Sequence, residues 1–269
     1  MFTSEMLALL AAPTAADDKY SRGVVSFLTG SAEYPGAAIL GVTAAIRTGV
    51  GMVRYEGPAE VSRLVLEVRP EVVCAPGRAQ SRVLGSGVPL VGAQAEAIGA
   101  FVQADELLVL DAGALSLIDF AALKPATAVL TPHAGEMARL LERLGITIEF
   151  DYEAAQRVAA ALNQFVLLKG NSTFVAAPWG EVVTIGPNPP ALATAGTGDV
   201  LAGILGAVLA HNHDQILADE NLFLTAIELA VLLHSAAAEL AAKDGPVAAL
   251  DVAEAVRLVV RDLQGGDLA

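Results

Sequence analysis

The sequence repeats one local pattern: a short apolar run, then a glycine-rich or polar corner, then an Ala/Leu-rich segment of helical length. The clearest apolar runs are residues 24–29, 107–110, 128–130 and 166–168. Short apolar strands that alternate with helices are typical of a parallel sheet covered by helices on both faces. The pattern therefore predicts an α/β fold with a mostly parallel central sheet.

Two further features refine this prediction. Trp179 and Gly180 separate the short runs 174–177 and 181–185 as a hairpin turn would, so part of the sheet is expected to be antiparallel. The last hundred or so residues have a mainly helical pattern. We expect a single domain over residues 1–269, in which about residues 1–18 form a leader segment.

The composition is rich in apolar residues but does not favour a membrane span. Hydrophobic residues make up 54% of the chain, and the excess is mostly alanine. A span needs about 18 nearly uninterrupted apolar residues. Asp199 interrupts the stretch 191–210, while Glu228, His234 and Glu239 interrupt 222–242. We therefore expect no membrane contact, and we interpret His234 as a core histidine of an Ala/Leu-rich helix.

Charge and cysteine content exclude other classes. The 16 Lys and Arg residues against 30 Asp and Glu residues give a net charge of −14, which argues against nucleic-acid binding. The single cysteine excludes an intramolecular disulfide and a zinc site built from several cysteines. A reducing, cytoplasmic location is expected.

Polar residues gather where the predicted strands end. In an open α/β sheet, ligands bind outside the carboxyl ends of the strands. The polar residues at these corners are Ser31, Asp111, His133, Glu136, Lys169, Asn171 and Thr173. The sequence therefore predicts a binding site at this edge of the sheet.

The segment Gly196-Thr197-Gly198-Asp199 opens a predicted helix that begins at Thr197. Glycines let the backbone approach a ligand closely, and the free N–H groups at the positive end of a helix suit a phosphoryl group. An aspartate there can take a proton from an attacking hydroxyl. The alternative is an Asp199 that only caps the helix between two tight glycines.

Lys169 ends an apolar run and precedes Gly170, Asn171, Ser172 and Thr173. A lysine in this position, followed by glycine and small hydroxyl residues, can bind phosphate by charge and hydrogen bonds. The alternative is a strand-ending lysine whose ammonium lies in solvent.

His133 and Glu136 are three residues apart at a predicted helix start, so both can face the same crevice. Glu136 could hold a hydrated magnesium ion, because Mg²⁺ keeps several of its waters and binds one or two carboxylates. The alternative is a carboxylate that caps the helix.

In this order and spacing, these segments resemble the ADP/ATP-dependent NAD(P)H-hydrate dehydratases of the ribokinase-like superfamily. The similar stretches are YPGAA at 34–38, TPHAGEMARLL at 131–141, LKGNST at 168–173 and LATAGTGDVL at 192–201. The Gly-Thr-Gly-Asp element is common to the superfamily, whereas TPHAGE and YPGAA are more specific to the dehydratases. The chain departs from the family at Ser86, where a proline is usual between two glycines, and at Gly113, where many relatives have aspartate.

The resemblance implies a ribokinase-like fold and a metabolite-repair reaction. The S form of hydrated NADH or NADPH would be phosphorylated on its C6 hydroxyl by ADP or ATP, and phosphate would then leave to restore the double bond. Asp199 would be the catalytic base, and Mg²⁺ would be held by Glu136 through water. The nucleotide would contact Lys169, Gly170, Asn171, Ser172, Thr173, Gly196, Thr197 and Gly198, and the hydrated dinucleotide would contact Ala37, Gly87, His133 and Asp199.

The resemblance also implies a homo-oligomer, often a tetramer. In some relatives an epimerase domain precedes the dehydratase, and we expect none here because only about 20 residues precede the matched region. One alternative function is a vitamin-precursor kinase of the same superfamily. A second is a non-catalytic nucleotide sensor, against which the combined presence of base, anion hole and phosphate lysine argues. Only the dehydratase would regenerate the near-ultraviolet absorbance of the reduced nicotinamide.

Overall fold

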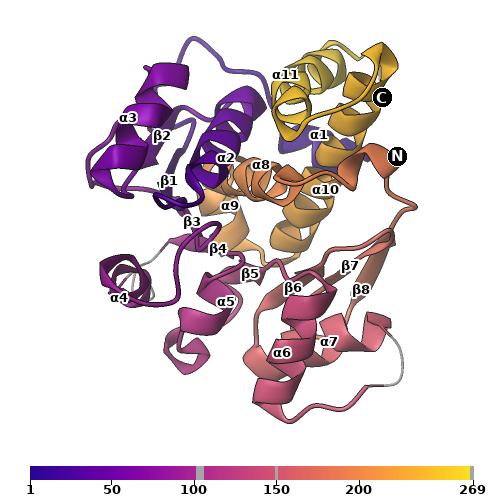
Figure 1. The fold of residues 1–269 in the computed structure, drawn as a ribbon. Coiled ribbons are helices and arrows are strands. Elements are labelled where there is room, and N and C mark those ends of the chain that lie inside the picture. Colours follow the sequence, from indigo (N-terminus) through magenta and orange to yellow (C-terminus); the bar gives the residue numbers. More distant parts are fainter. Residues whose placement is uncertain (101–105, 149–150, 267–269) are drawn as a thin grey trace.

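The computed structural model describes residues 1–100, 106–148 and 151–266 and is built on one eight-stranded sheet (Figure 1). The strand order is β2-β1-β3-β4-β5-β6-β7-β8. The first six strands in this order are parallel, while β7 is antiparallel to both β6 and β8. The strands are β1 Val24–Leu28, β2 Met52–Tyr55, β3 Ser81–Leu84, β4 Leu107–Leu110, β5 Ala128–Leu130, β6 Phe165–Leu168, β7 Thr173–Ala176 and β8 Val182–Ile185.

Helices cover both faces of this sheet, so the predicted architecture is confirmed. Figure 1 shows α2, α8, α10 and α11 above the sheet and α5, α6 and α7 below it. The antiparallel hairpin expected around Trp179 is present between β7 and β8. The helices are α1 Ser4–Ala8, α2 Pro35–Thr48, α3 Ala59–Val68, α4 Ala93–Ala100, α5 Ala114–Leu117, α6 Ala134–Leu144, α7 Asp151–Leu162, α8 Thr197–His211, α9 His213–Ala218, α10 Asn221–Ala241 and α11 Ala249–Gly265.

Successive side chains of each central strand enter two different cores. Leu107 and Val109 of β4 pack with α2, α8, α10 and α11, whereas Leu108 and Leu110 pack with α5, α6 and α7. Side chains alternate between the two faces of a strand, and here both faces are covered. This is why the strands appear in the sequence as continuous apolar runs rather than as alternating ones.

Strand β3 departs from that pattern because it contains a buried arginine. Arg82 is only 8% exposed. Its Nη1 lies 2.8 Å from Oε1 of Glu56, and its guanidinium also pairs with Glu106. The two carboxylates compensate the buried charge, which explains how an arginine fits inside the sheet and why the apolar pattern alone did not predict β3.

The first residues of the chain belong to the core rather than lying apart from it. Met6, Leu9 and Leu10 are each 6% exposed or less. The Asn212 side chain donates to the Leu9 carbonyl at 3.1 Å, and the Gln264 side chain donates to the Leu10 carbonyl at 2.8 Å. Residues 6–10 of the segment that we expected to be a leader therefore pack beside the ends of α8 and α11, whereas residues 11–18 are exposed.

One described helical stretch, Asn221–Asp244, is long and apolar enough to cross a membrane by length and composition. The charged residues that we expected to exclude a span do not by themselves do so. However, 61% of its most apolar window is buried inside the protein, where it contacts α8 and α11. Core helices pass the same test of length and composition.

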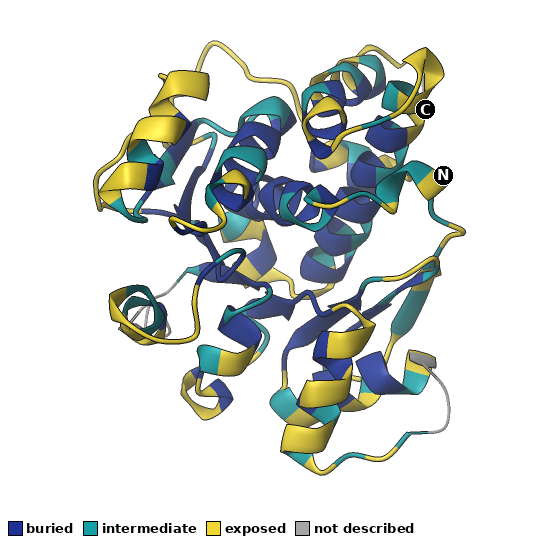
Figure 2. Cartoon of the chain, in the orientation of Figure 1, coloured by how far each residue is buried: buried dark blue, intermediate teal, exposed yellow. Residues whose placement is uncertain are grey.

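Two glycines let α8 lie directly against its neighbours. A Cβ atom added at Gly203 would lie 2.1 Å from the backbone oxygen of Gly41 in α2, and one added at Gly206 would lie 2.5 Å from a methyl group of Val83 in β3. Helix α8 is buried along most of its length (Figure 2). These close contacts at Gly203 and Gly206 determine the axis of α8, and with it the location of its first turn.

We expect Gly203→Ala to lower the free energy of unfolding by about 1–3 kcal/mol or more, because the added methyl forces the two backbones apart. Gly99→Ala in α4 is the matched control, since nothing lies within 4 Å of its added Cβ. The control should be neutral or stabilise by up to about 1 kcal/mol through helix propensity. Urea unfolding measures both, and equal stability of the two variants would contradict this account of the packing.

Candidate active site

The residues that follow four adjacent strands converge on the carboxylate of Asp111. This residue follows β4 and is 4% exposed. Its Oδ2 accepts a hydrogen bond from Ser86 after β3 at 2.8 Å. Its Oδ1 accepts from Thr131 after β5 at 2.8 Å and from the Lys169 ammonium after β6 at 2.7 Å. We call Ser86, Asp111, Thr131 and Lys169 the Asp111 cluster.

The cluster keeps two buried groups charged. Burial alone would raise the pKa of Asp111, but the Lys169 ammonium and the three hydrogen bonds outweigh it and hold the pKa below its usual value. Burial would lower the pKa of Lys169, and Asp111 reverses that shift. The Lys169 side chain is 21% exposed, so the alternative of an ammonium in solvent is wrong.

Asp199 lies in the first turn of α8, which begins at Thr197 as the sequence predicts. Burial, and secondarily the negative charge of Asp111, raise the pKa of Asp199 to about 7, although Lys169 opposes this shift. Within the described part of the chain, no hydrogen bond engages its carboxylate. Asp199 is therefore a half-buried carboxyl that can exchange a proton near neutral pH.

Gly196 and Gly198 are glycines for different structural reasons. Gly196 caps α8 with a φ of 92°, and a Cβ there would also lie 2.6 Å from Leu40, so the turn itself requires glycine. Gly198 is helical, and its added Cβ would meet only the Lys169 ammonium, at 3.5 Å. A side chain at Gly198 would thus occupy the space beside that ammonium without straining the backbone.

A cavity of about 360 Å³ opens beside this turn. Six of the residues predicted to contact a nucleotide line it, whereas Ser172 and Gly196 do not. Asn188, which the sequence analysis missed, donates to the Gly170 carbonyl at 2.8 Å and to the Thr173 hydroxyl at 2.9 Å. The lining residues are Lys169, Gly170, Asn171, Thr173, Asn188, Pro189, Pro190, Leu192, Ala193, Thr197, Gly198, Leu201, Val231 and His234.

His133 and Glu136 form a reciprocal cap at the start of α6. The His133 Nδ1 accepts a hydrogen bond from the Gly135 N–H at 3.0 Å, and Glu136 Oε2 accepts from the His133 N–H at 2.8 Å. The capping alternative for Glu136 is thus observed. The other carboxylate oxygen, Oε1, lies 3.5 Å from His133 Nε2, and the His133 side chain is 58% exposed.

The carboxylates of the site could bind Mg²⁺ only together with phosphate groups of a bound ligand. Among the described residues, no group of three or more His, Cys, Asp or Glu side chains could bind a metal. Mg²⁺ is commonly held by one or two carboxylates together with substrate phosphates and water. Glu136 Oε1, which the helix cap leaves free, and Asp199 satisfy that weaker requirement.

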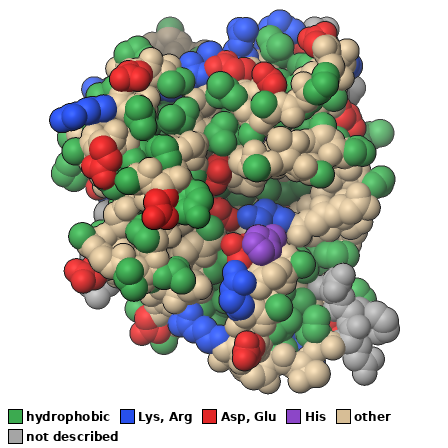
Figure 3. All heavy atoms as spheres, in the orientation of Figure 1, with side chains coloured by type: hydrophobic (Ala, Val, Ile, Leu, Met, Phe, Trp, Pro, Cys, Tyr) green, Lys and Arg blue, Asp and Glu red, His purple; other side chains and the backbone are tan. Residues whose placement is uncertain are grey.

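Ala37 and Gly87, which the sequence analysis proposed as substrate contacts, lie side by side. A Cβ added at Gly87 would lie 2.9 Å from the Cβ of Ala37, and the φ of Gly87 is +67°. Gly87 follows Ser86 of the Asp111 cluster, so this pair adjoins the buried charges. Figure 3 shows a hollow near the middle of this face where acidic, basic and histidine side chains meet.

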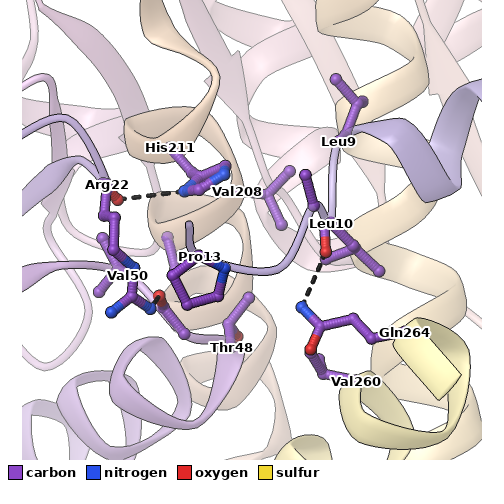
Figure 4. A pocket seen from close by; sticks show the side chains of 13 residues that line it. Leu9, Leu10, Pro13, Arg22, Thr48, Val50, Val208, His211, Val260 and Gln264 are labelled. Atoms are coloured by element: carbon purple, nitrogen blue, oxygen red, sulfur yellow. Dashed lines mark hydrogen bonds between the residues drawn. The ribbon is translucent and has the colours of Figure 1, made fainter. Parts of the chain in front are cut away.

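A second cavity, of about 120 Å³, lies at the opposite end of α8 (Figure 4). The side chain of His211 lies beside the carbonyl of Arg22, with Nδ1 3.2 Å from the oxygen, and Leu9, Leu10 and Pro13 form another wall. A helix rises about 1.5 Å per residue, so the length of α8 places this cavity roughly 20 Å from Asp199. It is not part of the candidate site.

Comparison with known proteins identifies relatives of this chain. A family model described as NAD(P)H-hydrate dehydratase matches residues 25–258. The bifunctional NAD(P)H-hydrate repair enzyme of Mycobacterium tuberculosis is 41% identical over 213 residues, which cover 74% of this chain and 43% of that protein. The chain thus spans less than half the length of that relative. The ADP-dependent (S)-NAD(P)H-hydrate dehydratase of Xanthomonas campestris is 33% identical over 256 residues, or 86% of this chain and 84% of that protein.

Solved structures agree with this assignment. The ADP/ATP-dependent NAD(P)H-hydrate dehydratase of Bacillus subtilis, co-crystallised with ATP and Mg²⁺, superimposes with a TM-score of 0.79 at 28% identity, covering 97% of this chain and 98% of that one. Ribokinase from Thermotoga maritima has a TM-score of 0.56 at 13% identity over 87% of this chain and 98% of that one. That second likeness concerns the fold alone, which is ribokinase-like as expected.

We expect Asp111→Asn to lower the free energy of unfolding at neutral pH by about 3–5 kcal/mol, because it leaves the buried Lys169 ammonium without its counter-charge. Asp244→Asn makes the same chemical change at an exposed carboxyl and should stay within about 0.5 kcal/mol of the parent. Denaturant unfolding of the two variants checks this. A loss below about 1 kcal/mol in Asp111→Asn would show that Lys169 does not depend on this carboxylate.

Proposed function

The chain belongs to the NAD(P)H-hydrate dehydratase family, and on that basis we propose that it returns the S form of hydrated NADH or NADPH to NADH or NADPH, using ADP or ATP as phosphoryl donor. The observation that carries this proposal is Asp199. It is a half-buried carboxyl without a hydrogen-bond partner among the described side chains, in the first turn of a helix, with its pKa raised to about 7. A base of that kind matches the deprotonation of a hydroxyl at neutral pH.

The first step transfers a phosphoryl group. Asp199 takes the proton of the C6 hydroxyl while the hydroxyl oxygen bonds to the terminal phosphorus of the nucleotide. The bond from that phosphorus to the bridging oxygen breaks, leaving AMP from ADP or ADP from ATP. The developing negative charge lies between the Lys169 ammonium and the first N–H groups of α8, which is the favourable end of the helix dipole.

The second step is elimination. The C6–O bond breaks and phosphate leaves, C5 loses a proton, and the ring double bond forms again. The sum is one nucleotide phosphoanhydride hydrolysed for one water removed from the substrate. Phosphorylation is useful here because it converts hydroxide, a poor leaving group, into phosphate.

The hydrated dinucleotide would lie along Ala37 and Gly87, with His133 at the mouth of the site. Ala37 is buried and Gly87 carries no side chain, so no long side chain of this pair covers the adjoining Asp111 cluster. His133 caps α6 through Nδ1 and is largely exposed, so its ring edge is open to a ligand. The nucleotide would occupy the 360 Å³ cavity.

Glu136 and the nucleotide phosphates are the groups that would hold Mg²⁺, with water between the ion and the carboxylate. When bound, the ion supplies neutralisation of phosphate charge. Glu136 retains Oε2 in the helix cap, so this role falls to Oε1.

We also propose a cytoplasmic location and a homo-oligomer, which follows the tetramers implied by the family resemblance. Light scattering on the purified chain tests the second point. Whether the chain discriminates between ADP and ATP is open to the same assay that tests the reaction.

The deciding experiment follows reduced-nicotinamide absorbance with purified hydrated NADH and ADP, ATP or no nucleotide. Recovery of absorbance that requires a nucleotide supports the proposal. A stable phosphate ester without recovery would indicate a small-molecule kinase instead. Nucleotide binding with neither product would indicate a sensor.

We expect Asp199→Asn to reduce turnover by about 10²–10⁴-fold, because amide nitrogen and oxygen cannot accept the hydroxyl proton. ADP affinity, measured by calorimetry, should change by only a few-fold. In the parent enzyme kcat/KM should rise with pH and level off above the Asp199 pKa of about 7, since only the ionised carboxylate is a base. An Asn variant with full activity, or a kcat/KM that falls as pH rises through 7, would remove Asp199 from this role.

Gly198→Ala and Gly196→Ala distinguish a glycine that leaves room for an anion from a glycine that the turn itself requires. The Gly198 variant should keep its thermal midpoint but lose about 10²-fold or more in turnover, because its methyl lies 3.5 Å from the Lys169 ammonium where the phosphoryl group must enter. Gly196→Ala should instead melt earlier, since its φ of 92° is unfavourable for alanine. Thermal unfolding and rate are measured on the same preparation. Normal turnover in folded Gly198→Ala would refute the anion site.

A further inference from the structure

The buried imidazole of His234 is not satisfied by the protein. This residue lies in α10, is 6% exposed and lines the 360 Å³ cavity. Its Nε2 atom is buried and, within the described part of the chain, has no hydrogen-bond partner. A buried polar atom left in this state is unfavourable, because it has lost its hydrogen bonds to water without gaining others. The core role that we expected for His234 therefore accounts for its burial but not for its unpaired nitrogen, which points to a ligand.

The protonation state of His234 determines what that ligand must offer. Burial lowers the pKa of His234 to about 4, so the ring is neutral at physiological pH. A neutral imidazole has one N–H donor and one nitrogen that accepts. The backbone of Thr197 also acts on the imidazole, in the direction that favours its protonated form. With the ring proton on Nδ1, the unpartnered Nε2 is the acceptor.

The cavity around His234 has two chemically different parts. Lys169 and the first turn of α8 provide charge and N–H groups suited to phosphate. Elsewhere the wall carries the polar side chains of Asn171, Thr173 and Asn188, and a larger group of aliphatic and prolyl residues next to His234. Those apolar residues are Pro189, Pro190, Leu192, Ala193, Leu201 and Val231. An apolar wall beside one buried, unpartnered polar atom suits a flat base and fixes its orientation.

From these observations we infer that His234 selects adenine, by accepting at Nε2 a hydrogen bond from the 6-amino group of the base. An ionised phosphate cannot supply this bond because it only accepts. Guanine and hypoxanthine cannot supply it from position 6, where they carry a carbonyl oxygen. The inference rests on the proposed function, in that the cavity takes the nucleotide, and adds the residue that distinguishes its base.

Calorimetric titration with ADP and inosine 5′-diphosphate tests the inference, because the two ligands differ only in the base. The parent protein should bind ADP about 10- to 100-fold more tightly, since inosine diphosphate leaves a buried acceptor facing another acceptor. His234→Phe keeps a flat ring but has no nitrogen, so it should lose ADP affinity and bind the two ligands within about threefold of each other. Retention of the parental preference in the folded Phe variant would overturn the inference.

A measurement on the parent protein removes any dependence on the folding of that variant. The chain has four histidines, so imidazole ¹⁵N spectra are simple to assign. The His234 Nε2 signal should show an unprotonated nitrogen that shifts on addition of ADP and does not shift with inorganic pyrophosphate. An Nε2 that is already protonated, or that moves equally with pyrophosphate, would overturn the inference.

The outcomes also separate this inference from the dehydratase proposal. Equal affinity of the parent for ADP and inosine diphosphate would reject base selection by His234, even if ADP drives dehydration normally. Conversely, a strong ADP preference that His234→Phe abolishes would support the inference even if hydrated NADH is not dehydrated. In that second case only the proposed reaction would fail.

Discussion

The ion pair between Asp111 and Lys169 is the interaction on which the rest of the site depends. Each charge is buried and would be strongly unfavourable alone, so neither can be lost without a penalty on the other. The Ser86 and Thr131 hydroxyls complete the hydrogen bonding of the carboxylate, which ties together the ends of β3, β4, β5 and β6. The same negative charge acts on Asp199 across the site and contributes to its raised pKa. The stability of this edge of the sheet and the proton affinity of Asp199 therefore depend on the same ion pair.

Packing of α8 provides the second half of the geometry. Direct backbone contact through Gly203 and the tight approach of Gly206 to β3 leave this helix little freedom to slide. Its first turn is consequently held over the Asp111 cluster, and Gly196 supplies the left-handed residue that lets the chain enter the helix there. The strands thus contribute the cation, and α8 contributes both the free N–H groups and the unpaired carboxyl.

The sequence predicted those features of the fold that depend on neighbouring residues. The apolar runs predicted β4 and β5, because a buried strand is a continuous apolar run. The Gly-Thr-Gly-Asp segment predicted the start of α8 at Thr197, because helix initiation is also a local property. It did not predict β3, since the partners that neutralise Arg82 are 26 and 24 residues away. It named Asp111 and Lys169 at strand ends but not their pairing, which joins residues 58 apart. Nor could a helical pattern distinguish a satisfied core histidine from His234, whose environment comes from α8 and the loop before it. The reaction itself was suggested by family resemblance rather than by periodicity.

The burial of the first helix has a consequence for how the chain folds. Leu9 and Leu10 accept hydrogen bonds from Asn212 and Gln264, which follow them by more than two hundred residues, and Figure 1 shows the two ends of the chain on the same side of the molecule. Contacts this distant in sequence form slowly, because a long loop must close before they return any free energy. During synthesis the apolar side chains of α1 therefore remain without their partners until α11 has emerged. Over that interval Met6 of α1, and Leu9 and Leu10 just after it, are exposed to other chains, so this segment is open to premature association.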